Sequence, residues 1–281
     1  MKFSFMLFHL LSLLLFLSCD SDGPTFSQEI LPGDDPNFKI VANKDGVLKS
    51  YNRKVVVFGI SIYAVAEVED KKLLHAANIM AQYLDNDEDG EVDNSLVWEK
   101  MKEKKAFMVM WKREKDLRVK IPNGWEGQDL GNDETHPDFV KQSLSGPFDA
   151  SLEEVLHIIT HAGYAEVYPD IFGEKAGSKL ADAMDKARGG RFTRIPNPYP
   201  DDAWYSYDDK TCDYACMLTE YHYWALTSLL GAHANRLNEI GREWRANTPE
   251  KLQEMDADAY ALLTDPQYHF PRVLPDGTYM R

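Results

Sequence analysis

Positive charge is scarce in this sequence. Its 281 residues include 31 lysine and arginine residues against 46 aspartate and glutamate residues, a formal net charge of −15. Nucleic acids and anionic membrane surfaces attract basic proteins, so this balance argues against both as binding partners. The sequence also lacks internal repeats and low-complexity tracts. Its hydrophobic content of 44% is ample for a folded core.

Long hydrophobic runs are absent except near the N-terminus. Residues 3–17, which follow Lys2, are too short for a comfortable membrane span and are typical of a secretory signal peptide. The run ends in the letters LFLSC at 15–19, which resemble the bacterial lipobox. This resemblance implies a signal peptide at 1–18, a lipid on Cys19, and a location in the bacterial cell envelope, facing the periplasm or the exterior. The membrane would then be reached through the lipid anchor only. A soluble secreted protein with ordinary cleavage is the alternative.

Cysteine is scarce as well. Beyond Cys19 the sequence has only Cys212 and Cys216. Residues spaced i and i+4 near a helix start have Cα atoms roughly 6 Å apart, which is within disulfide range. A close pair in an exported protein tends to oxidise, so we predict a disulfide between Cys212 and Cys216. A pair of thiolate metal ligands is the alternative.

Hydrophobic periodicity predicts strands early in the sequence and helices late. We expect strands within 37–69 and at 106–111, and a loop-rich stretch at 118–147. We expect helices at 70–84, 95–104, 151 onward, 174–188, 212–231 and 249 onward. The fold class is therefore α+β, with N-terminal strands and a mostly helical C-terminal half.

The predicted elements also suggest the domain organisation. A tether at 19–36 separates the signal peptide from a single domain at 37–281. Within that domain, a β-rich part at 37–118 carries a candidate calcium loop. A helical part at 119–281 carries a candidate metal site.

An acidic segment between two predicted helices resembles an EF-hand calcium loop. Its carboxylates occupy the ligand positions, glycine stands at the sharp turn, and the side chains offered are Asp85, Asp87, Asp89, Glu91 and Asp93. Leu96 stands where the family has a bidentate glutamate, so closure of the site must come from elsewhere or from water. The resemblance implies a bound calcium ion with a structural role. An acidic turn that binds nothing is the alternative.

Two histidines and two glutamates share one face of the helix that is predicted from Ser151. His157 and His161 are spaced i and i+4 and stack on that face, one turn beyond Glu153 and Glu154. Imidazole and carboxylate groups are ligands for zinc and similar divalent metals. The stripe lies opposite the hydrophobic side of the helix, so it faces either solvent or a cleft. Ser151 and Glu154 also have the spacing of a capping box, which would occupy Glu154 at the helix start.

A third ligand is expected from the hydrophobic helix at 212–231. Glu220 lies in this segment, and a buried carboxylate is expensive unless it is protonated, paired or bound to metal. Two histidines on one helix and a glutamate on a later helix resemble the gluzincin-type zincin metallopeptidases. The resemblance implies zinc or a similar divalent metal on His157, His161 and Glu220. An ion pair between Glu220 and a nearby arginine is the alternative.

The sequence departs from this family at the general base. Zincins have glutamate directly after the first histidine, and the inverted form has it directly before the second, but here these positions hold Ile158 and Thr160. Glu154 or Glu153, one turn earlier, would then act as the base. If neither does, the site is a non-catalytic metal centre.

Aromatic residues between 191 and 224 suggest a substrate cleft. Tyr205, Tyr207 and Tyr223 are its candidate lining residues. We therefore predict an exported, lipid-anchored, metal-dependent hydrolase of peptidase-like type, with a structural calcium site and a small-molecule, peptide or glycan ligand. The alternative is a non-catalytic, calcium-stabilised, ligand-binding lipoprotein, which would contain calcium and no transition metal.

Overall fold

The computed structural model describes residues 35–117 and 120–281, and all of them belong to one compact unit. The predicted signal peptide, the lipidation site Cys19 and the tether up to residue 34 lie outside the described residues. Asp35, which falls in the predicted tether, is already fastened to the fold. Its carboxylate accepts hydrogen bonds from Asn78 Nδ2 (2.8 Å) and from the backbone amides of Asn37 and Phe38.

The fold is α+β, as the order of the predicted elements indicates. A five-stranded sheet has the order β1-β2-β3-β4-β5, antiparallel from β1 to β3 and parallel from β3 to β5. Its strands are β1 (Val41–Ala42), β2 (Arg53–Val57), β3 (Ile60–Ala64), β4 (Phe107–Trp111) and β5 (Gly127–Gly131). Phe58 and Gly59 join β2 to β3 at positive φ (46° and 85°), which suits a two-residue hairpin turn.

Two helices connect β3 to β4 and flank the acidic loop. They are α1 (Asp70–Leu84) and α2 (Ser95–Glu103), and they match the predicted ranges closely. From Leu73 onward α1 is buried along its whole length. The strand β5, in contrast, lies in the stretch that the sequence indicates to be loop-rich.

The C-terminal half is helical. Its helices are α3 (Ser151–Ile159), α4 (Ala165–Val167), α5 (Lys179–Ala187), α6 (Tyr214–Leu229), α7 (Leu237–Ile240), α8 (Pro249–Met255) and α9 (Ala257–Thr264). A π-helical turn, Thr160–Tyr164, joins α3 to α4. Short 3-10 turns lie at Glu114–Leu117, Asn132–Glu134 and Pro266–Tyr268. Among the described helices, none has the length and apolar character needed to cross a membrane.

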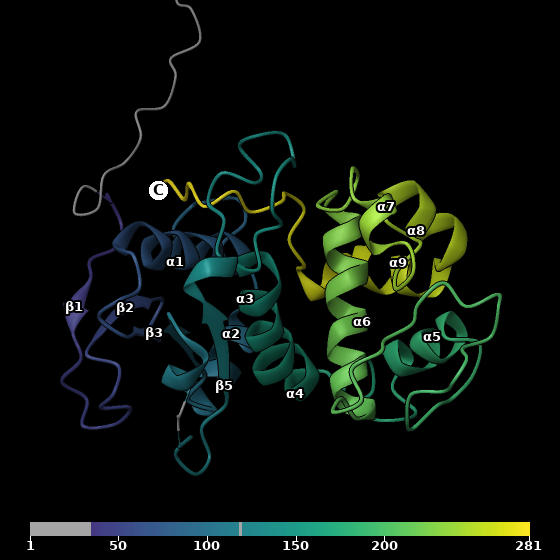
Figure 1. Ribbon diagram of the computed structural model, residues 1–281, viewed down its shortest axis with the longest axis horizontal. Helices are drawn as coiled ribbons and strands as arrows, with labels where there is room; N and C mark the ends of the chain where they lie inside the picture. Colours follow the sequence, from purple (N-terminus) through teal and green to yellow (C-terminus); the bar gives the residue numbers. More distant parts are fainter. Residues whose placement is uncertain (1–34, 118–119) are drawn as a thin grey trace, which may run out of the picture. The chain divides into compact units, whose positions relative to one another are not determined.

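Helix α3 lies between the sheet and the C-terminal helices. It packs against α1 and β5 and also against α6, as Figure 1 shows. Side chains on the α6 side of α3 therefore lie between the two parts of the fold. This position makes α3 and α6 the walls of the candidate site.

The C-terminal segment returns from the helical half to the acidic loop. In Figure 1 it runs as a yellow trace from α9 toward α1. The backbone amides of Arg272 and Val273 both donate to Asn86 Oδ1 (2.8 Å each). Farther along, the Tyr279 hydroxyl donates to the Asp85 carboxylate.

Candidate metal centre

Helix α3 is fixed at its start by a buried aspartate. Asp149 Oδ2 accepts a hydrogen bond from Ser151 Oγ (2.6 Å) and lies 2.6 Å from His75 Nε2. Ser151 is the first helical residue and Ala150 is the N-cap, so the predicted capping box with Glu154 does not form. The reason is that the Ser151 hydroxyl donates to Asp149 instead of accepting from the first turn. Glu154 is therefore available for contacts beyond the helix start.

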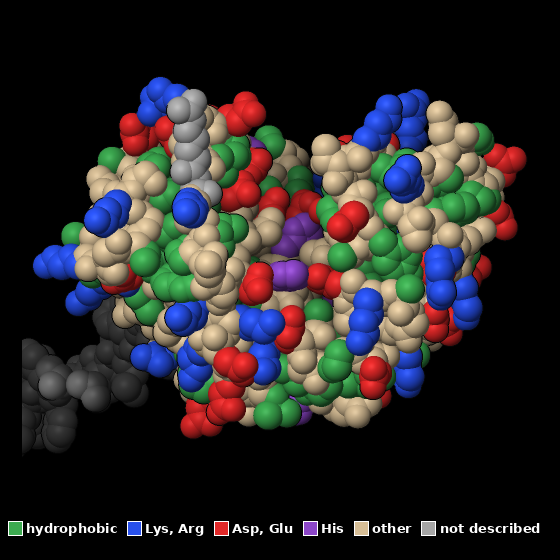
Figure 2. Space-filling model, turned by 90° about the horizontal axis from the view of Figure 1, so that it is seen from below, with side chains coloured by type: hydrophobic (Ala, Val, Ile, Leu, Met, Phe, Trp, Pro, Cys, Tyr) green, Lys and Arg blue, Asp and Glu red, His purple; other side chains and the backbone are tan. Residues whose placement is uncertain are grey.

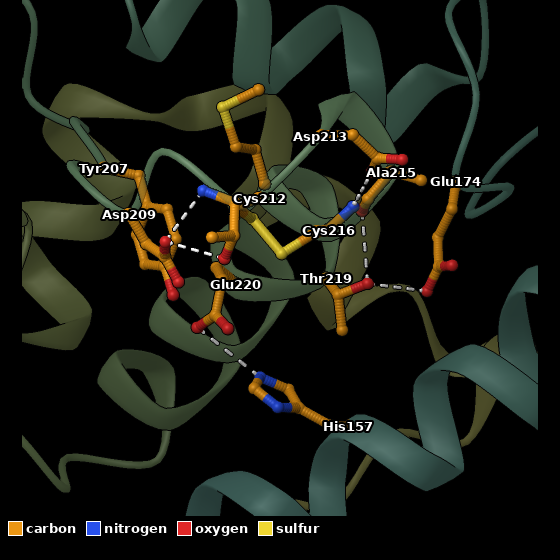
Figure 3. The surroundings of a disulfide bond; sticks show 12 residues. His157, Glu174, Tyr207, Asp209, Cys212, Asp213, Ala215, Cys216, Thr219 and Glu220 are labelled. Atoms are coloured by element: carbon orange, nitrogen blue, oxygen red, sulfur yellow. Dashed lines mark hydrogen bonds and ion pairs between the residues drawn. A yellow bond between two sulfur atoms is a disulfide. The ribbon is translucent and has the colours of Figure 1, made fainter. Parts of the chain in front are cut away.

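Helix α6 supplies the facing carboxylate. Asp213 caps it by accepting from the Cys216 amide (3.0 Å), and Cys212 and Cys216 are joined as a disulfide with Cα atoms 5.3 Å apart. Figure 3 shows Glu220 farther along the same helix, pointing toward the imidazole of His157. The cap and the disulfide thus fix the N-terminal end of α6, and Glu220 lies farther along this helix.

Three side chains converge between α3 and α6. Glu153, His157 and Glu220 each offer one ligand atom, and these atoms lie within 4.8 Å of one another. His157 is only 5% exposed. Its Nε2 atom lies 3.6 Å from Glu220 Oε2 and has no hydrogen-bond partner among the described residues. A buried imidazole nitrogen is normally paired, so this one fits a position for a cation between the ring and the two carboxylates.

The charges of the cluster are not balanced. Burial raises the pKa of Glu153 well above its ordinary value, His157 opposes this rise, and the carboxylates of Glu154 and Glu220 add to it. Burial likewise raises the pKa of Glu220. Burial alone would lower the pKa of His157, but the surrounding carboxylates, Glu220 first, raise it to about 9. A divalent cation would relieve the same repulsion between carboxylates.

Glu154 lies at the edge of this cluster. Its Oε2 atom is 3.5 Å from His157 Nδ1, and it accepts a hydrogen bond from Gln128 of β5. The Glu154 side chain is 22% exposed, so solvent reaches it. A carboxylate beside Nδ1 favours the tautomer in which Nδ1 carries the proton and Nε2 keeps its lone pair. Glu154 thus orients His157 for ligation through Nε2.

The structure does not bring His161 into the cluster. His157 meets Glu153, one turn earlier, which agrees with the tendency of helical side chains to point toward the helix N-terminus. His161 lies one turn later, with Nδ1 2.6 Å from Glu174 Oε2 and Nε2 3.4 Å from Glu126 Oε2. The hydrogen bond with Glu174 raises the pKa of His161 to about 9. Both ring nitrogens of His161 are thus engaged by carboxylates, whereas Nε2 of His157 has no hydrogen-bond partner among the described residues.

Two of the three predicted cleft tyrosines contact the cluster. The Tyr223 hydroxyl interacts with Glu153 and the Tyr207 hydroxyl with Glu220, and each contact moderates the rise in pKa that burial causes. The Tyr223 ring also lies edge-on to the His157 ring, with centroids 5.6 Å apart. Both tyrosines therefore border the cluster and favour the ionised forms of its carboxylates.

A pocket of about 390 Å³ opens beside the cluster, and Glu153, Tyr207 and Tyr223 are among its lining residues. One face of the molecule is hollowed at its centre, and histidine and acidic side chains gather in that hollow (Figure 2). Tyr205 does not line the pocket, which corrects the prediction. It is 1% exposed, and its hydroxyl donates to the Met217 carbonyl (2.7 Å), because this residue packs into the core beneath α6.

The acidic loop brings three of the five predicted calcium ligands together. Carboxylate oxygens of Asp85, Asp87 and Asp89 lie within 4.8 Å of one another. Gly90 has φ +94°, which provides the turn that this loop requires. Leu96 is 57% exposed and contributes no oxygen, as the sequence indicates.

The other two predicted calcium ligands stay outside this group. Glu91 is exposed, and Asp93 Oδ2 accepts a hydrogen bond from the Asn86 amide (2.8 Å). Burial raises the pKa of Asp93, although that hydrogen bond opposes the rise. Asp85 is fully buried and is contacted by Tyr279 from the C-terminal segment. The loop is therefore tied to the end of the chain.

Among the site residues, the metal-ligand role of Glu153 could be predicted from the sequence, whereas the roles of Gln128 and Glu243 could not. The i, i+4 spacing of Glu153 and His157 is a signal for a pair of ligands, whereas the family resemblance assigns Glu153 the role of a base. Gln128 and Glu243 belong to no motif. Gln128 holds Glu154, and Glu243 lines the pocket, where burial raises its pKa to about 7.

Comparisons with known proteins do not extend this description. No family model, curated protein or solved structure matches the chain. The geometry and chemistry of the residues themselves are therefore the basis for the function proposed below.

Proposed function

We propose that this chain is an exported, metal-dependent hydrolase whose metal is held by Glu153, His157 and Glu220. The observation that carries the proposal is the buried Nε2 atom of His157, which lacks a hydrogen-bond partner in the described part of the chain and faces two carboxylates. One imidazole and two carboxylates suit zinc or a similar divalent metal, and three protein ligands leave a coordination position open. Export and lipid attachment at Cys19 rest on the sequence alone.

This ligand set is consistent with the zincin-like resemblance if the pair of helix ligands is moved one turn earlier, from His157 and His161 to Glu153 and His157. We call this the shifted register. Glu153 and His157 are spaced i and i+4, as the two helix ligands of a zincin are. Glu154 directly follows the first ligand, where that family has its general base. The pair His157 and His161 offers no such residue, so the shifted register supports catalysis better.

Each residue then has a defined task. When bound, the metal supplies an activated water molecule and polarises a carbonyl oxygen of the substrate. Glu154 accepts the proton of the attacking water and delivers it to the leaving group. Tyr223 and Tyr207 lie beside the carboxylates of Glu153 and Glu220 and favour the ionised forms that bind a metal.

The activity is tested by incubating the purified chain with a mixture of peptides and identifying products by mass spectrometry. We expect hydrolysis that a zinc-selective chelator abolishes and added zinc restores. His157→Ala should remove it, whereas the matched variant His161→Ala should retain it. Metal-independent hydrolysis, or equal loss in both variants, would refute the proposal. Ligand binding without turnover and without transition metal would favour the non-catalytic lipoprotein.

Calcium is the second metal of the proposal. The support is the convergence of Asp85, Asp87 and Asp89 on a loop with the glycine turn of an EF-hand. Calcium there would neutralise a concentration of negative charge between α1 and α2. Its role is structural, because the loop holds Tyr279 and with it the C-terminal segment.

A further inference from the structure

The pocket beside the candidate metal centre has more negative charge than positive charge available to a ligand. It is lined by the rings of Tyr207, Tyr223 and Trp224, and by the carboxylates of Asp208 and Glu243 among others. Its volume of about 390 Å³ is enough for one long side chain. Because Glu153 also lines it, a group held in this pocket lies next to the proposed reaction centre.

Glu243 is a partly buried acidic group of this pocket. One carboxylate oxygen accepts a hydrogen bond from Trp224 Nε1 (3.0 Å), and within residues 35–117 and 120–281 no cation lies at ion-pair distance. Burial raises the pKa of Glu243 to about 7, with Glu220 and Asp208 adding to the effect, while the Trp224 hydrogen bond and the positive charge of Arg236 oppose it. A cationic ligand would stabilise the charged form of a partly buried carboxylate that has no ion-pair partner.

The pocket also contains two arginines, Arg236 and Arg242, and Arg236 is engaged by groups other than Glu243. Arg236 is bound by Glu239 at 2.7 and 3.2 Å and donates to His233 Nδ1 (3.1 Å). Its guanidinium also lies 3.9 Å from the centre of the Phe148 ring. Arg242 is exposed and is not among the groups that act on Glu243. Among the described residues, neither arginine lies at ion-pair distance from Glu243 or Asp208, so both carboxylates remain available to a ligand.

We propose that this pocket binds an ammonium or guanidinium group of the substrate between Glu243 and Asp208, against the rings of Trp224 and Tyr207. Aromatic faces attract organic cations, and a desolvated carboxylate adds a charge-assisted hydrogen bond. The substrate class rests on the proposed function: the substrate would be a peptide with a basic side chain or a free amino terminus near the bond that is cut. The binding itself requires no catalysis.

The test measures binding of small probes by calorimetry or NMR. Nα-acetyl-lysine amide and Nα-acetyl-arginine amide are compared with the neutral Nα-acetyl-norleucine amide and Nα-acetyl-citrulline amide. A dipeptide amide with a free amino terminus, and its acetylated form, distinguish the two sources of the cation. We expect the cationic probes to bind at least about 10-fold more tightly than their neutral partners. Tighter binding of an anionic probe, Nα-acetyl-glutamate amide, would overturn the proposal.

Two substitutions locate the binding. Glu243→Gln keeps the acceptor for Trp224 but removes the charge, and should weaken cation binding by about 10-fold or more. Asp208→Asn gives a second, more exposed change in the same direction. Glu254→Gln removes an exposed carboxylate outside the pocket and should change nothing. Equal affinities in all three variants would overturn the assignment.

The outcome also separates this inference from the proposed hydrolase. If cations bind through Glu243 but no hydrolysis is found, the pocket assignment stands and the catalytic proposal fails. If zinc-dependent hydrolysis shows no preference for basic peptides and Glu243→Gln is without effect, the catalytic proposal stands and the pocket assignment fails.

Discussion

The Nε2 atom of His157 lies 3.6 Å from the nearest oxygen of Glu220 and makes no hydrogen bond within the described residues. The distance is too long for a hydrogen bond and leaves room for an ion between the two groups. Glu153 approaches the same point from the preceding turn of α3. In the absence of a cation, this arrangement keeps carboxylates close together in a largely buried site.

The first prediction concerns pH. The pKa of His157 is raised from 6.5 to about 9, so the stability it contributes is present below pH 6.5 and is lost as the pH rises through 9. The raised pKa of Glu153 has the same sign, because the folded chain keeps a proton that the unfolded chain loses above about pH 4.5. The metal-free protein should therefore lose up to about 1.4 kcal/mol of stability per pH unit and per group over these ranges.

Urea denaturation of metal-free protein between pH 5 and 9 measures this effect. Glu153→Gln should flatten the decline. Because a metal displaces the same protons, its stabilising effect should grow with pH. A metal-free stability that increases toward pH 9 would contradict the proposed charge balance.

The second prediction concerns acid. His222 is buried beside Phe172, with ring centroids 5.6 Å apart, and burial together with the charge of His157 lowers its pKa to about 3. The stability it contributes is present above pH 6.5 and is lost as the pH falls toward 3. His222→Phe should reduce the acid sensitivity by up to about 1.4 kcal/mol per pH unit. The exposed His269→Asn is the control, and an unchanged acid profile in His222→Phe would argue against a neutral buried imidazole.

Much of the fold follows from the sequence, because local patterns suffice where packing agrees with them. Helix α1 and strand β4 show clear helical and β-branched or aromatic patterns. Strand β5 has the sequence Gly-Gln-Asp-Leu-Gly, which has no β propensity, and is a strand only because it pairs with β4.

The site is harder to predict, because spacing does not show which turn of a helix faces a partner. The i, i+4 pair His157 and His161 is matched by an equal pair, Glu153 and His157. The position of Glu220 along α6 decides between the two pairs, because Glu220 lies beside Glu153 and His157. His161 instead contacts the carboxylates of Glu174 and Glu126. These are contacts between residues far apart in the sequence, and local sequence patterns do not reveal them.

The third prediction separates two roles of Glu154. Glu154→Gln can still accept from His157 Nδ1 but cannot take a proton from water, so it should keep metal affinity and lose turnover by about 100-fold or more. Glu154→Ala removes both and should also weaken metal binding by about 10-fold or more. Zinc titration and peptide hydrolysis are measured on the same preparations. Full turnover in Glu154→Gln would show that another group is the base.

The fourth prediction concerns calcium. Calcium at 100 times its dissociation constant should stabilise the protein by about 2.7 kcal/mol, which thermal unfolding detects. Asp87 is exposed and makes few contacts of its own, so Asp87→Asn should leave calcium-free stability unchanged and remove most of the calcium effect. Asp201→Asn, an exposed change outside the loop, should respond as the parent does. Equal calcium shifts in Asp87→Asn and the parent would exclude this loop as the site.

The most direct test of the central claim is metal content. Protein purified without a histidine tag is stripped, incubated with zinc, and analysed for bound zinc by mass spectrometry of the metal, in parallel with His157→Ala and His161→Ala. We predict one zinc per chain in the parent and in His161→Ala, and none in His157→Ala. Zinc retained by His157→Ala and lost from His161→Ala would contradict the assignment of Glu153, His157 and Glu220 as the metal ligands.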